Sequence, residues 1–286
     1  MSQSSATAID KLKAFVFYAL PHHFISRIVF KLTRIKSPKA IPVIRWFIKS
    51  FKVEMSDAVN PDPTSYPSFN DFFIRPLVDG ARPLCDEAYL ASPVDGTVSQ
   101  ARKIENGSIF QAKGHAYTAN QLLGNEPNLR DTFKDGQFAT IYLAPYNYHR
   151  IHMPCDGTLK QMIHVPGRLF SVAPWTVNSV PGLFARNERV VCIFDTEYGP
   201  LAMVLVGAIN VAAIETVWAG LITPPKGKKV NAQRYENRNI TLKKGEEMGR
   251  FNMGSTVILL TGSDITWLDK MNNGQVLKMG EAIAKH

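Results

Sequence analysis

Gly254 and Ser255 precede the apolar run 257–260, and these two residue types suit a reaction of the backbone with itself. A serine hydroxyl can attack the carbonyl of the residue before it, and a glycine at that position leaves the carbonyl accessible because it has no Cβ. β-Elimination of the resulting ester and hydrolysis would leave a pyruvoyl group, a ketone that can act as an electron sink. A Gly-Ser step before a β-branched run is also typical of a simple turn that leads into a buried strand.

Three further residues supply the groups that such a reaction needs. His152, in the segment His149-Arg150-Ile151-His152, can accept the Ser255 proton, and Asp95 can orient its imidazole as in a hydrolase triad. Taken alone, Asp95 in Val-Asp-Gly fits an ordinary turn. His149 and His152 would point to opposite faces of a strand, whereas a bend would bring them to one site. A His-x-x-His pair also fits zinc, but no third ligand accompanies it, so we expect no metal.

The segments that must position these residues are predominantly strands. Apolar and β-branched runs alternate with glycine turns from residue 92 onward. The predicted strands cover 96–99, 138–143, 190–194, 201–206, 209–218, 256–260 and 274–283, and the clearest helix covers 117–123. Turns of the form basic-x-Gly-acidic resemble those of barrel-sandwich hybrid folds, which is an analogy of fold alone. We predict an α+β, β-rich fold with a barrel-sandwich-hybrid-like body over residues 54–286.

The first 53 residues differ from this body in charge. They hold ten basic residues and one acid, and the formal net charge of the whole chain is +9. Apolar residues recur there at helical spacing, with breaks at Pro21 and near Pro38 and Pro42. Amphipathic helices of this kind suit an anionic membrane surface, although they can also pack on a core with their basic faces in water. We predict a membrane-association region over 1–53, no transmembrane helix and no nucleic-acid partner, since no recognised binding motif accompanies the charge.

Six separated motifs make the sequence similar to the prokaryotic phosphatidylserine decarboxylase proenzymes over nearly its whole length. They are Phe-Phe-Ile-Arg-Pro-Leu (72–77), Pro-Val-Asp-Gly (93–96), Tyr-His-Arg-Ile-His-Met-Pro (148–154), Phe-Ala-Arg-Asn-Glu-Arg (184–189), Glu-Thr-Val-Trp-Ala-Gly (215–220) and Gly-Ser-Thr (254–256). Met253 stands where that family usually has leucine, and the two side chains are alike in volume and polarity.

The resemblance implies a self-cleavage triad of Asp95, His152 and Ser255. Cleavage between Gly254 and Ser255 would give a β chain (1–254) and an α chain (255–286) that stay together, with Ser255 converted into the pyruvoyl cofactor. The amine of phosphatidylserine would then form a Schiff base with this ketone, lose carbon dioxide and leave as phosphatidylethanolamine.

For the remaining residues the resemblance implies roles in binding and decarboxylation. His149 would act on the substrate's phosphate or carboxylate or reprotonate the carbanion, and Ser171 is a candidate for the substrate site. The resemblance also implies a peripheral protein on the cytoplasmic side of the cell membrane and a homodimer.

Two interpretations from other functional classes stay open. One is a zinc-dependent hydrolase on a related hybrid fold, which would use His149 and His152 as ligands. The other is a non-enzymatic membrane-surface module in which Gly254 and Ser255 form only a turn. The first predicts a bound metal, and the second predicts an intact chain without lyase activity.

Overall fold

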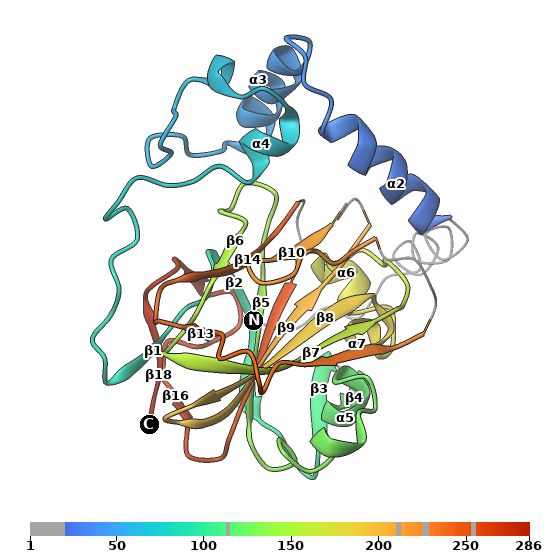
Figure 1. Cartoon of the computed structure of the whole chain (residues 1–286), viewed down its shortest axis with the longest axis vertical. Coiled ribbons are helices and arrows are strands. Elements are labelled where there is room, and N and C mark those ends of the chain that lie inside the picture. Colours follow the sequence, from blue (N-terminus) through green and yellow to red (C-terminus); the bar gives the residue numbers. More distant parts are fainter. Residues whose placement is uncertain (1–20, 113–114, 210–212, 225–228, 253–255) are drawn as a thin grey trace.

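The computed structural model describes residues 21–112, 115–209, 213–224, 229–252 and 256–286 of the 286-residue chain. Three helices near the N-terminus lie at one end of the molecule, and the rest of the described chain forms a strand-rich body (Figure 1). The predicted β-rich α+β class is confirmed. The likeness of the body to a barrel-sandwich hybrid stays a prediction.

The helical end consists of α2 (His22–Thr33), α3 (Ala40–Phe51) and the short α4 (Phe69–Phe73). Pro21 immediately precedes α2, as predicted, whereas Pro42 lies within the first turn of α3, where a missing N–H breaks no helical bond. Ile44 and Phe47 of α3 are buried against the aromatic rings of α4. None of the helices within the described ranges is long and apolar enough to cross a bilayer.

The largest sheet is antiparallel, in the order β12-β7-β8-β9-β15-β5-β2-β17, and β13 pairs with β7. Its strands are β2 (Gly96–Lys103), β5 (Gln137–Tyr142), β7 (Gly157–Val165), β8 (Arg189–Thr196), β9 (Gly199–Val206), β12 (Asn231–Arg234), β13 (Thr241–Leu242), β15 (Thr256–Thr261) and β17 (Val276–Leu277). All six residues of β15 are buried between β9 and β5. The apolar run after the Gly-Ser step is therefore an interior strand, as its composition predicts.

A second antiparallel sheet has the order β11-β10-β14-β6 and carries the histidine segment. Its strands are β6 (Arg150–His152), β10 (Ile214–Thr216), β11 (Gly220–Leu221) and β14 (Glu247–Phe251). The register pairs His152 with Glu247 and Arg150 with Arg250. Because β14 leads toward residues 253–255, β6 lies beside the strand that enters the predicted cleavage segment.

The remaining strands form a three-stranded sheet and a hairpin. The sheet comprises β1 (Tyr89–Ala91), β18 (Ala282–Lys285) and β16 (Thr266–Trp267), and the hairpin comprises β3 (Ser108–Ala112) and β4 (His115–Thr118). Short helices α5 (Ala119–Leu122), α6 (Pro174–Val177) and α7 (Leu183–Arg186) connect these elements, with single 3₁₀ turns at Pro63–Ser65 and Pro127–Leu129.

Three predicted elements were too long. The helix expected over 117–123 is only α5, because Tyr117 and Thr118 belong to β4 and Thr118 forms a capping box with Gln121. The strand expected over 274–283 divides into β17 and β18 at a turn with Gly280 at φ +90°. Of the strand expected over 209–218, β10 covers 214–216, and residues 210–212 lie outside the described ranges.

Candidate active site

The His152 imidazole has a hydrogen-bond partner on each ring nitrogen. Its Nδ1 lies 2.7 Å from the Gly245 carbonyl oxygen, and its Nε2 lies 3.0 Å from the Tyr148 hydroxyl. A carbonyl oxygen only accepts, so Nδ1 holds the proton and Nε2 accepts the Tyr148 hydroxyl proton. Burial lowers the pKa of His152, against the Gly245 carbonyl and the charge of Glu247, which raise it. The ring is therefore neutral, with the basic nitrogen that a general base needs.

Gly245 presents its carbonyl to His152 from a backbone conformation that requires glycine. Its φ is +80°, and a Cβ there would lie 2.6 Å from Leu84 Cδ1. The preceding residue, Lys244, is buried and donates its three ammonium protons to the carbonyls of Cys85, Asp86 and Tyr89. This anchor fixes the turn that orients His152.

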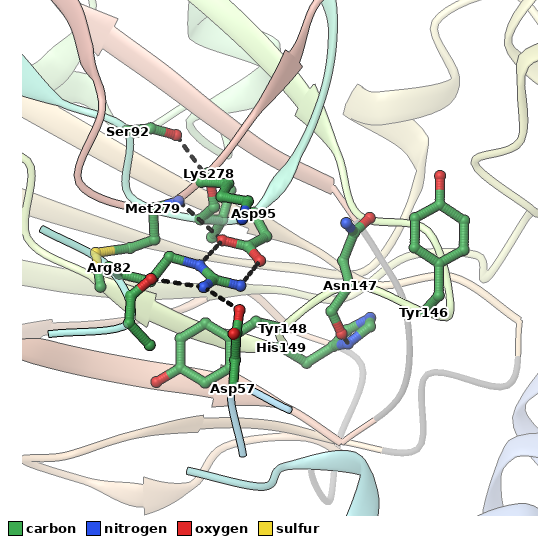
Figure 2. Close-up of polar contacts among 12 residues, drawn as sticks. Asp57, Arg82, Ser92, Asp95, Tyr146, Asn147, Tyr148, His149, Lys278 and Met279 are labelled. Carbon is green, nitrogen blue, oxygen red and sulfur yellow. Dashed lines mark hydrogen bonds and ion pairs between the residues drawn. The ribbon is translucent and has the colours of Figure 1, made fainter. Parts of the chain in front are cut away.

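Asp95 is held by Arg82. The Arg82 Nε donates to Asp95 Oδ1 at 2.9 Å and Nη2 donates to Oδ2 at 2.7 Å, while Arg82 Nη1 donates to Asp57 at 2.8 Å (Figure 2). The Met279 backbone N–H donates to Asp95 Oδ1 at 2.8 Å. No hydrogen bond joins Asp95 to His152 within the part of the chain that the structure describes. The predicted action of Asp95 on His152 thus stays a prediction, and the effect that the structure shows is the charge of Asp95, which raises the pKa of His152 less than burial lowers it.

His149 lies in surroundings different from those of His152. It is fully buried, its Nδ1 donates to the Asn147 carbonyl at 2.8 Å, and its ring lies 4.2 Å from that of Phe73 in α4 (Figure 2 shows the Asn147 contact). Its Nε2 has no hydrogen-bond partner among the described residues. Burial lowers the pKa of His149 to about 3. His149 is therefore neutral, with an unused acceptor on Nε2.

Gly254 and Ser255 lie outside the described residues, but the described residues nearest to them on both sides are hydrogen-bonded or paired within sheets. Phe251 N–H donates to the His149 carbonyl at 3.0 Å, and Asn252 N–H donates to the Ala213 carbonyl at 2.9 Å. On the other side, Thr256 pairs with Tyr142 and Val206 at the start of β15. The strand before the predicted cleavage segment and the strand after it thus belong to two different sheets, and the first of them ends with Phe251 beside His149.

Ser171 lines a cavity of about 210 Å³ together with Tyr142, Val172 and the α3 residues Phe47 and Phe51. A second cavity, of about 140 Å³, shares Tyr142 and Val172 and is also lined by Thr256. The two cavities therefore share a wall formed by Tyr142 and Val172, with Ser171 lining one cavity and Thr256 lining the other.

In the ranges that the structure describes, no group of three His, Cys, Asp or Glu side chains is arranged to hold an ion. Sequence reasoning did not single out Arg82, Gly245 or Tyr148 as parts of this site. Tyr148 was within a recognised motif, whereas Arg82 and Gly245 reach their partners through tertiary folding, without a local signal.

The chain is similar to known proteins along nearly its whole length. Residues 69–285 match the family model described as phosphatidylserine decarboxylase, and residues 12–52 match a second model described as PSD. Relatives named phosphatidylserine decarboxylase proenzyme include one from Alkalilimnicola ehrlichii, 59% identical over 91% of this chain and 92% of its own length. Others come from Vibrio vulnificus (53% identical over 96% and 99%) and Shewanella loihica (54% identical over 97% and 99%). The chain belongs to the phosphatidylserine decarboxylase family.

Proposed function

We propose that the chain is a proenzyme that cleaves itself between Gly254 and Ser255, and that the mature protein uses the pyruvoyl group formed from Ser255 to decarboxylate phosphatidylserine to phosphatidylethanolamine. The family activity and the proenzyme names of the relatives support this proposal. The pyruvoyl group would supply the electron sink for loss of carbon dioxide. The single observation that carries the proposal is the neutral His152, whose protonated Nδ1 is fixed and whose Nε2 is basic.

In self-cleavage, His152 would act as the base for the Ser255 hydroxyl. Proton transfer to Nε2 would create an imidazolium, whose Nδ1–H is already bonded to the Gly245 carbonyl. The charge of Asp95 favours this cation, since it raises the pKa of His152, although burial has the larger and opposite effect. Asp95 therefore suits the stabilising role of a triad carboxylate without a direct hydrogen bond.

His149 would act in decarboxylation by accepting and returning a proton at Nε2. Its Nδ1 proton is committed to the Asn147 carbonyl, so Nε2 offers a lone pair and no donor. A phosphate or carboxylate oxygen needs a donor, which the neutral ring lacks on that side. The lone pair on Nε2 can, however, accept the proton that the substrate ammonium must lose before its nitrogen reacts, and can later return that proton to the carbanion. Of the three roles that the resemblance implies, proton return is therefore the one that uses this lone pair.

The helical end would hold the protein on an anionic membrane at its cytoplasmic face. An apolar groove of about 590 Å³ lies between α2 and α3, lined by Leu32, Val43 and Trp46, and the Trp46 side chain is 61% exposed. Phe47 and Phe51 line both this groove and the Ser171 cavity. The proposed membrane surface therefore adjoins the proposed substrate site, so a lipid head group can reach it without leaving the bilayer.

The same proposal includes the division into residues 1–53 and 54–286, a homodimer, and a barrel-sandwich-hybrid-like body. The packing of α3 on α4 means that the two regions share a small aromatic core. Residues 1–53 would thus present the membrane surface while remaining attached to the catalytic body.

The intact mass of purified protein tests the proposal. We expect two fragments that meet after Gly254, the smaller about 17 Da lighter than a chain that begins with serine, and conversion of phosphatidylserine vesicles to phosphatidylethanolamine. Ser255→Ala should stay a single chain, whereas Ser263→Ala, an exposed serine in the same fragment, should cleave normally. A wild-type chain at full encoded mass after incubation with lipid would refute self-cleavage.

A further inference from the structure

We propose that Asn187 is a positioning residue for the substrate site, which sets the shape of the Ser171 cavity by holding two of its walls together. Asn187 lies between α7 and β8, in the motif Phe-Ala-Arg-Asn-Glu-Arg (184–189). The inference rests on the proposed function, in which the Ser171 cavity receives the substrate. It adds a residue that acts on the walls of that cavity rather than on the substrate itself.

The Asn187 amide joins two separate backbone segments. The residue is fully buried, its Nδ2 donates to the Phe170 carbonyl and to the Gly207 carbonyl, each at 2.9 Å, and its Oδ1 accepts from the Phe170 N–H at 3.0 Å. Both carbonyls only accept and the N–H only donates, so these partners allow one orientation of the amide. The side chain therefore ties both backbone groups of Phe170 to Gly207.

The two segments that Asn187 joins continue directly into the walls of the cavity. Residues 171–173, which follow Phe170, and residues 208–209, which follow Gly207, line the cavity of about 210 Å³. The spacing between these two walls therefore depends on the hydrogen bonds of the Asn187 amide.

Backbone pairing fixes the loop between β7 and α6 only as far as Arg168. The Arg168 N–H donates to the Arg186 carbonyl at 2.8 Å, and the Glu188 N–H donates to the Arg168 carbonyl at 2.7 Å. Two residues later, the bonds from the Asn187 side chain hold Phe170. The amide thus extends the attachment of the loop to the residue immediately before the cavity wall.

Loss of the amide should change substrate binding rather than the chemical step. A cavity that is complete for only a fraction of the time binds its ligand with an affinity reduced by that fraction. Substrate that is bound still occupies the complete cavity and reacts as before. We therefore expect KM to rise while kcat stays nearly unchanged. Each lost hydrogen bond shifts an equilibrium of this kind by about two- to tenfold.

Asn187→Ala and Asn187→Asp test the inference in the cleaved, mature enzyme. Alanine removes all three bonds, whereas aspartate keeps the volume and the acceptor for Phe170 N–H but loses both amide donors. Both variants should cleave by intact mass, and their KM for phosphatidylserine in mixed micelles should rise at least about fivefold with kcat within about twofold of wild type. Lowering the pH should reduce the KM of Asn187→Asp relative to wild type at the same pH, because a protonated carboxyl regains one donor. If Asn187→Ala leaves no cleaved protein, Asn187→Ser, whose hydroxyl can still bond one carbonyl, is judged by the same KM and kcat.

Ile104→Ala is the matched control for a loss of stability. Ile104 is fully buried and donates its N–H to the Gly136 carbonyl at 2.8 Å beside the start of β5, whereas the cavity is lined by Tyr142 at the other end of that strand. This control should lower Tm without changing KM. The inference is wrong if the Asn187 variants lower Tm at unchanged KM, if they lower kcat at unchanged KM, or if Ile104→Ala raises KM as much as they do.

Ser171→Phe separates failure of the inference from failure of the proposed function, because a phenyl ring would fill the cavity. If Ser171→Phe leaves KM unchanged, the cavity does not receive the substrate, and the proposed substrate site fails together with the inference. If Ser171→Phe raises KM while the Asn187 variants do not, only the inference fails.

Discussion

The pairing of Arg82 with Asp95 predicts the effect of removing the arginine. Both side chains are buried, 9% and 8% exposed, and are joined by two hydrogen bonds. Arg82→Met would leave the Asp95 carboxylate buried with only the Met279 N–H. Removing one partner of a buried pair typically costs about 3–5 kcal/mol. Arg82 also pairs with Asp57, which is 31% exposed. Because solvent screens this ion pair, its loss should reduce the free energy of unfolding by about 1 kcal/mol or less.

The assay is thermal unfolding in a Ser255→Ala background, so that every variant is the same uncleaved chain. In a protein of this size about 1 kcal/mol corresponds to about 2–4 °C, so Arg82→Met should lower Tm by at least about 6 °C. Adding Asp95→Asn removes the uncompensated charge while keeping an oxygen for Met279 N–H. The double variant should therefore be more stable than Arg82→Met alone, with a coupling of at least about 2 kcal/mol between the two positions.

Additive changes in Tm would refute this reasoning, because independent effects mean that the carboxylate is not left buried when the arginine is removed. A fall in Tm of less than about 2 °C in Arg82→Met would also refute the reasoning, because it would mean that Asp95 is not left as a buried unpaired charge. The Tm of Arg82→Lys should lie between those of the wild type and Arg82→Met. An ammonium keeps the positive charge but cannot donate two parallel hydrogen bonds to the carboxylate.

Two further predictions concern decarboxylation and the membrane. His149→Gln should cleave normally by intact mass yet form phosphatidylethanolamine at least about tenfold more slowly, because it loses the Nε2 lone pair; an uncleaved variant would contradict the division of roles between the two histidines. Leu32→Glu with Trp46→Glu should weaken co-sedimentation with phosphatidylserine vesicles while leaving cleavage intact, because both side chains are exposed in the apolar groove. Val276 is equally exposed but lies in the body, so Val276→Glu is the control. Equal vesicle binding by the wild type, the double variant and the control would argue against membrane binding by the groove.

The sequence predicted those parts of the fold that depend on local pattern. The run after Ser255 is apolar and β-branched, and β15 is indeed buried along its whole length. Pro21 immediately precedes α2, where its missing N–H removes no helical hydrogen bond. The bounds of α5 were predicted wrongly, although Thr118 and Gln121 have the capping-box spacing that marks the start of this helix.

The hydrogen-bond partners in the site could not be predicted from local sequence pattern. The partner of His152 Nδ1, Gly245, is 93 positions away in the chain and contributes a backbone carbonyl, which every residue has. Asp95 was expected beside His152, but an arginine 13 positions earlier, without any motif, takes both of its oxygens. Residue types thus indicated the chemistry, whereas the pairing of donors with acceptors depends on how distant loops pack.

The proposed cleavage breaks the only covalent link between the two chains. Strand pairing between them should nevertheless keep them together. The α chain would contain β15, whose neighbours β9 and β5 both belong to the β chain, and also β17 and β18, which pair with β2 and β1. Four of the buried side chains of β15 are Val257, Ile258, Leu259 and Leu260, and each contributes about 1.5–3 kcal/mol on burial. Withdrawing β15 alone would thus cost about 6–12 kcal/mol, before its backbone hydrogen bonds are counted. The same pairing holds Thr256, the residue after the new chain end, in the wall of a cavity that shares Tyr142 and Val172 with the Ser171 cavity.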